Sequence, residues 1–124
     1  MVDSLRAEFA VSIPGPGENP LRAVRRLNPA AILLAVPRGR SNEAVRTCRL
    51  IKTDSGTPPL VGLLDQGSRI RRPERTLSHA LADGYIGGRI DAADLLSFVL
   101  SLIQGERPVV VNKPPPGLLK RLLR

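Results

Sequence analysis

Arginine is the residue type in this chain with the greatest capacity for chemistry. Sixteen of the 19 basic residues are arginines, against 11 acidic residues, and the formal net charge is +8. The densest positive stretch, residues 69–75, holds four arginines and one glutamate. A guanidinium group can bind a phosphate or a carboxylate through two parallel hydrogen bonds, so this stretch could clamp an anion. The alternative is a solvated surface that only keeps the protein in solution.

Side chains suited to nucleophilic or metal chemistry are few. His79 is the only histidine and Cys48 the only cysteine, so a cysteine-based zinc site and an internal disulfide are excluded. Cys48 falls on the apolar stripe of a predicted helix, which indicates a buried, unreactive thiol. His79 lies off its helical stripe, and no neighbouring residue is in place to orient it for catalysis. We therefore expect no enzymatic activity, no cofactor and no metal.

An unbroken apolar run at residues 30–36 is the stretch that organises the fold. Seven apolar residues between two prolines suit a strand covered on both faces, as in a parallel sheet. Strand and helix signals alternate along the chain, which predicts an α/β, doubly wound sheet of five parallel strands. The predicted strands are 9–13, 30–36, 60–64, 85–87 and 108–112, and the predicted helices are 20–27, 41–52, 77–81, 92–104 and 118–123.

Size and composition fit a single domain, residues 1–124, with one core. The chain has no Trp, two Phe and one Tyr, so the core must be mainly aliphatic. No apolar run approaches the roughly 20 residues that a membrane span needs, and no signal peptide is visible. We therefore expect a soluble, cytoplasmic protein without a membrane partner.

Three segments, in the same order and at the same spacing, resemble parts of one known family. They are residues 28–36 (NPAAILLAV), residues 48–61 ending in GTPPLV, and residues 80–91 (ALADGYIGGRID). They look like the third strand (PDLILLDV), the third helix with the fourth strand, and the AGADDYLTKPID segment of the receiver domain of bacterial two-component response regulators. The resemblance implies a flavodoxin-like or receiver-like fold and a role in bacterial signalling.

The positions that carry phosphotransfer in that family hold different residues here. By the resemblance, the phosphoacceptor aspartate falls on Ala35, the switch serine or threonine on Leu64 and the lysine on Gly88. A methyl group, an isobutyl group and a hydrogen supply no nucleophile, no Mg²⁺ ligand and no cation for a phosphoryl group. The resemblance therefore implies a pseudo-receiver that does not accept a phosphoryl group.

The C-terminal segment looks like the family's first strand and helix (ILIVDDDPALRELLR), displaced to the end of the chain. In residues 107–123 (RPVVVNKPPPGLLKRLL), Asn112 and Lys113 stand where the family has its acidic pair. We expect a circular permutation, in which strand 108–112 takes the place of the first strand beside residues 30–36. Alternatively, the strand and the amphipathic helix within 113–124 pack elsewhere or swap into a second copy.

Two functions stay open. A pseudo-receiver would act as a protein–protein interaction or scaffolding module, binding a signalling protein or a second copy at the face where family members dock partners. That face would hold four arginines around one tyrosine, a composition typical of interface hot spots: Arg71, Arg72, Arg75, Tyr85 and Arg89. The alternative is an anion-binding module for a nucleotide, a cyclic dinucleotide or nucleic acid, which the scarcity of aromatic stacking residues disfavours.

Overall fold

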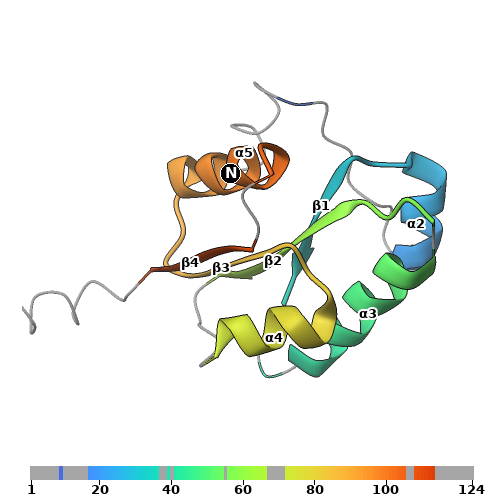
Figure 1. Cartoon of the computed structure of the whole chain (residues 1–124), viewed down its shortest axis with the longest axis horizontal. Coiled ribbons are helices and arrows are strands. Elements are labelled where there is room, and N and C mark those ends of the chain that lie inside the picture. The colour runs from blue at the N-terminus through green and yellow to red at the C-terminus, as the bar shows by residue number, and fades with distance from the viewer. Residues whose placement is uncertain are drawn as a thin grey trace, which may run out of the picture.

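A computed structural model describes residues 9, 17–36, 39, 41–54, 56–66, 72–105 and 108–113. Four strands and four helices alternate within this part of the chain (Figure 1). They are α2 (Pro20–Leu27), β1 (Ala31–Ala35), α3 (Ser41–Asp54), β2 (Leu60–Gln66), α4 (Pro73–Ala80), β3 (Gly84–Gly88), α5 (Ala92–Ile103) and β4 (Val109–Lys113). The expected α/β alternation is confirmed, whereas the strand expected at 9–13, apart from Phe9, and the helix expected at 118–123 lie outside the described residues.

The four described strands form one parallel sheet in the order β1-β2-β3-β4. β4 pairs with β3, where Val110 lies opposite Tyr85, and β2 and β3 separate it from β1. The expected permutation is therefore wrong, because strand 108–112 extends the sheet at the far edge and does not enter beside residues 30–36. The described sheet also has four strands where five were expected.

The edge of β3 accepts β4 because apolar surface is present on both faces of the sheet there. Val109 and Val111 pack against the core on the α5 side, and Val110 packs against the core on the opposite side. A strand with three consecutive valines thus buries side chains in both directions, which an exposed position would not allow. Burial on both faces stabilises β4 without any contact with β1.

Each face of the sheet has its own hydrophobic core. Ile32, Val61, Leu63 and Tyr85 point to the face covered by α2, α3 and α4, whereas the intervening strand residues point to α5 (Figure 1). The alternation follows from the two-residue period of a strand. The core on the α5 side contains the buried residues Ile86, Ile90, Leu95, Phe98, Val99 and Leu102.

Two glycines paired across the sheet let α5 approach it closely. Gly62 in β2 lies opposite Gly84 in β3. A Cβ atom at Gly62 would lie 2.6 Å from Cε2 of Phe98, and a Cβ at Gly84 would lie 2.8 Å from Cδ2 of Leu102. The phenyl ring therefore occupies space that any other residue at position 62 would fill.

The ends of the helices follow the signals in the sequence. The Asn19 side chain accepts a hydrogen bond from the Leu21 N–H at 2.9 Å and caps α2, with Pro20 as the first helical residue. At α5, Asp91 and Asp94 form a reciprocal capping box. Local side-chain chemistry thus places the start of both helices where the sequence predicts it.

Candidate functional site

The carboxyl ends of the strands are the usual site of ligand binding in an open parallel sheet. Here Ala35 lies opposite Leu64 on one side of the sheet. Gly88 lies opposite Lys113, and Asn112 opposite Gly87, on the other side. Three strand spacings, roughly 14 Å, separate β1 from β4. The resemblance assigned five residues to a former phosphoacceptor pocket. All five lie near the carboxyl edge of the sheet, but they do not come together at one point.

The polar pair at this edge is Asp65 with Tyr85. Oη of Tyr85 donates a hydrogen bond to Oδ2 of Asp65 at 2.9 Å, and the two residues are 0% and 3% exposed, respectively. The tyrosine side chain lies over Gly87, where a Cβ atom would collide with its hydroxyl. Because Gly87 is the register partner of Asp65, the tyrosine reaches directly across the strands to the carboxylate.

Sequence reasoning missed this pair. The sequence predicts a strand that ends at residue 64, but Asp65 lies inside β2 with its side chain buried. The sequence predicts Tyr85 on an interaction face, but the residue is fully buried in the core that α3 and α4 cover. One signal could have indicated the arrangement: a glycine two residues after a strand aromatic leaves room for the ring to lie along the strand.

The described residues of the predicted interaction face do not share one surface in the structure. Arg72, Arg75 and Arg89 are exposed, as an interaction face requires. Tyr85 is not available to join them, and Arg71, like Arg69, lies outside the described residues. The tyrosine-centred cluster expected from the sequence is thus not formed by the residues that the structure describes.

A different set of arginines gathers on two neighbouring helices, and we call it the α3–α4 patch. Its members are exposed: Arg46, Arg49, Arg72 and Arg75. Nη1 of Arg49 donates a hydrogen bond to the backbone oxygen of His79 at 2.7 Å, which joins the third turn of α3 to the end of α4. Helices α3 and α4 lie side by side (Figure 1), and Arg46 and Arg75 each precede, by one helical turn, one of the two residues that this bond joins.

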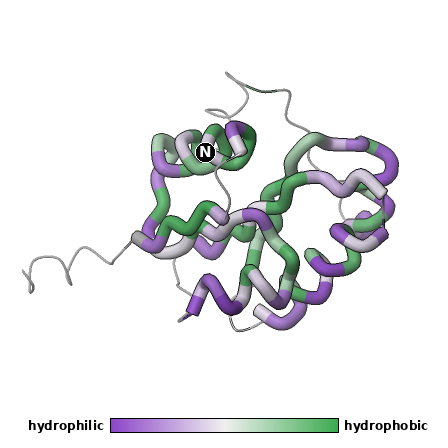
Figure 2. The backbone as a smooth tube through the Cα atoms, in the orientation of Figure 1, coloured by the Kyte–Doolittle hydropathy of each residue, from purple (hydrophilic) through white to green (hydrophobic). Residues whose placement is uncertain are grey.

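The arginines of α2 differ from those of the patch. Arg25 binds Asp54 through two hydrogen bonds of 3.0 and 2.7 Å, and Arg26 binds Glu18 in the same way at 2.9 and 2.8 Å. The four patch arginines have no such acidic partner among the residues described. Along α3 and α4, hydrophilic residues alternate with hydrophobic ones (Figure 2). The charge of α2 is thus partly neutralised within the fold, and the charge of the α3–α4 patch faces solvent.

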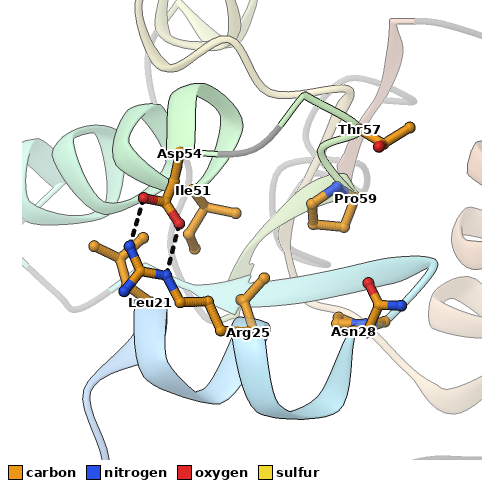
Figure 3. A pocket seen from close by; sticks show the side chains of 9 residues that line it. Leu21, Arg25, Asn28, Ile51, Asp54, Thr57 and Pro59 are labelled. Atoms are coloured by element: carbon orange, nitrogen blue, oxygen red, sulfur yellow. Dashed lines mark hydrogen bonds and ion pairs between the residues drawn. The ribbon is translucent and has the colours of Figure 1, made fainter.

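A small pocket between α2 and α3 lies at the opposite end of the sheet from the usual ligand site. Leu21, Asn28, Ile51 and Pro59 line it, and the Arg25–Asp54 pair spans one side (Figure 3). The Arg25 guanidinium, through its hydrogen bonds and charge, lowers the pKa of the Asp54 carboxyl. The two charged groups bind each other, so the Arg25–Asp54 pair joins α2 to α3 and presents no free polar group to a ligand in the pocket.

A mostly buried ion pair joins α3 to the amino ends of β2 and β3. Nζ of Lys52 lies 2.8 Å from Oδ2 of Asp83 and 3.0 Å from the backbone oxygen of Pro59. The same carboxylate oxygen accepts a hydrogen bond from the Val61 N–H at 2.8 Å. Asp83 therefore receives donors from both a helix and a strand, which indicates a structural role.

The chemistry of the single thiol is suppressed by its position. Cys48 is 0% exposed, and burial raises its pKa to about 12, with a smaller opposing effect of Lys52. The expected buried thiol is confirmed. His79 is exposed, as predicted. The described residues contain no group of three or more His, Cys, Asp and Glu side chains that could hold a metal ion.

Comparisons with known proteins identified no relative of this chain. No family model, no curated protein and no solved structure matches the chain. The resemblance to receiver domains stays a prediction based on the three sequence segments. None of the described helices is long and apolar enough to cross a membrane.

Proposed function

We propose that this chain is a non-catalytic, receiver-like interaction module that binds an acidic segment of a partner protein through the α3–α4 patch. The observation that carries the proposal is the contrast between arginines that bind a carboxylate within the fold and arginines that do not. Arg25 and Arg26 each bind a carboxylate within the fold, whereas the four patch arginines are exposed without an acidic partner in the described region. A role in bacterial signalling follows from the family resemblance and is part of the proposal.

The charge of the two helices supports an acidic partner. Apart from Lys52 and Asp54, which are paired with Asp83 and Arg25, α3 and α4 with Arg72 carry four arginines and two glutamates, Glu43 and Glu74. These side chains therefore carry an excess of two positive charges. Guanidinium groups are weakly hydrated and bind carboxylates in a planar fork, so arginine is better suited than lysine to such an interface.

The carboxyl edge of the sheet supports a role without phosphotransfer. Ala35, Leu64 and Gly88 have no ionisable side chain, and the nearby carboxylate of Asp65 is buried and bound by Tyr85. A phosphoacceptor must be reachable by its donor and by Mg²⁺. We therefore place binding on the helices and assign no reaction to the strand ends.

The test is a charge reversal with a matched control. The tagged protein, the double variant Arg72→Glu/Arg75→Glu and the single variant Arg22→Glu are used to capture proteins from extracts of the source cells at two salt concentrations. Arg22 is an exposed arginine on α2, away from the patch. We expect a protein retained by the wild type and by Arg22→Glu to be lost from the double variant.

Direct binding of the identified protein then decides the assignment. Its affinity should fall at least tenfold with the double variant and less than twofold with Arg22→Glu. Equal retention by all three proteins would contradict the proposal. Retention that nuclease abolishes, with a steep loss of binding between low and moderate salt, would favour the alternative of an anion-binding module that contacts phosphates.

A further inference from the structure

The last helical crossover of the sheet has the opposite hand to the two before it. Strand order advances by one step in the same direction from β1 to β2, from β2 to β3 and from β3 to β4, and all pairs are parallel. The first two connections pass through α3 and α4 on one face, where Cys48, Leu77 and Tyr85 pack together. The third passes through α5 on the other face, where Phe98 and Leu102 pack on Gly62 and Gly84.

Parallel crossovers are right-handed in about 98% of cases, because the twist of the strands favours that hand. Equal steps over opposite faces must differ in hand, so at least one of these three crossovers is left-handed. The connection that differs from the other two is β3–α5–β4. A chain can avoid a left-handed connection, and keep every strand pair, if the final strand comes from another copy.

The connection from α5 to β4 is short and bears a helix-ending glycine. α5 ends at Ile103, β4 begins at Val109, and Gly105 adopts a left-handed conformation with φ of 89°. A short connection between a packed helix and an edge strand is the kind of hinge at which strands exchange between identical chains. The edge strand also contributes packing that the fold needs from one copy or the other, since Val109, Val110 and Val111 contribute to both cores.

We propose that β4 is exchanged between two copies of this chain, so that each β3 edge is completed by the Val109–Lys113 strand of the other copy. The contacts of β4 with β3, α5 and the two cores are the same in both arrangements. Only the connection between α5 and β4 changes: it makes a left-handed crossover within one chain in the first arrangement and joins two chains in the second. This inference is independent of the proposed binding of an acidic partner.

A disulfide between register partners tests the exchange. Ile86 and Val111 are opposite each other on the α5 side, so Ile86→Cys/Val111→Cys, made with Cys48→Ala, places two thiols on neighbouring strands. The control, Ile32→Cys/Val61→Cys in the same background, joins β1 and β2 at another register pair. After oxidation, we expect a covalent dimer from the Ile86/Val111 pair and a covalent monomer from the control pair.

The unmodified protein provides a second measurement that does not depend on buried cysteines. Native mass spectrometry should show twice the chain mass of 13.4 kDa, and two tagged forms should give mixed dimers only after unfolding and refolding together. A monomeric mass at every concentration would overturn the proposal. A disulfide within one chain for the Ile86/Val111 pair would also overturn it, even if the protein were dimeric.

Discussion

Tyr85 and Asp65 form a buried hydrogen bond of 2.9 Å between two adjacent strands, β3 and β2. The phenol reaches the carboxylate by lying along its own strand, over Gly87. A carboxylate in this position loses much of its hydration, and the hydroxyl replaces part of it. The bond therefore fixes the tyrosine ring in the core and keeps it away from the protein surface.

Replacing Tyr85 with phenylalanine tests the energetic role of that bond. The ring would remain packed, but the Asp65 carboxylate would lose one buried donor, at a cost of about 1–3 kcal/mol in the free energy of unfolding. Urea titration of Tyr85→Phe, Asp65→Asn and the double variant measures the coupling between the two residues. Additive effects of the two single changes would show that the bond contributes no coupling energy.

Replacing Gly62 with alanine should destabilise the protein, since the new methyl group would meet the Phe98 ring. Overpacking of this kind costs about 1–3 kcal/mol. The control is Gly56→Ala, because a Cβ atom there meets nothing within 4 Å. Adding Phe98→Leu to Gly62→Ala should restore part of the loss if contact with the ring is the cause. A Gly62→Ala variant as stable as Gly56→Ala would contradict the close packing of α5.

The Cys48 thiol should resist alkylation in the native protein. Burial raises its pKa to about 12, so only a minute fraction is thiolate at pH 8, and the sulfur has no exposed surface. Iodoacetamide should label the unfolded protein in urea at least a hundredfold faster than the folded protein. Equal rates would show that the thiol is accessible.

Because of the same thiol, the free energy of unfolding should change with pH in the alkaline range. A folded-state pKa near 12, above the ordinary value of 9.0, means that the folded state holds the proton more tightly than the unfolded chain. Stability from this group is therefore complete below pH 9 and falls as pH rises from about 9 towards 12. Cys48→Ala should lack this component of the decline. Identical slopes for the variant and the wild type would contradict the assignment.

Two ion pairs should differ in how much they contribute to the free energy of unfolding. Lys52 and Asp83 are mostly buried, with side-chain exposures of 13% and 14%, whereas Arg25 is 67% exposed. Lys52→Met keeps the apolar stem but removes a charged donor, so we expect a loss of about 2 kcal/mol. Arg25→Met should cost clearly less, because solvent and salt screen an exposed pair. Thermal and urea unfolding of both variants would measure the difference, and equal losses would contradict it.

Local patterns in the sequence predicted the four strands and four helices that the structure describes, and their alternation. The apolar run at 30–36 became β1, the caps at Asn19 and Asp91 set the starts of α2 and α5, and the position of Cys48 on an apolar stripe predicted its burial. These features are local, because helix periodicity, strand propensity and end capping depend on residues a few positions apart.

The order of the strands in the sheet and the pairing of the buried polar groups were not predictable from these local patterns. β4 lies beside β3 and not beside β1, Tyr85 lies in the core and not on the surface, and Asp65 is its partner. A run of valines favours a strand that is buried on both faces, but it does not determine which strand will pair with it. That neighbour is chosen by contacts between distant parts of the chain, where the α5 core and the glycine pair at 62 and 84 supply the surface that β4 completes.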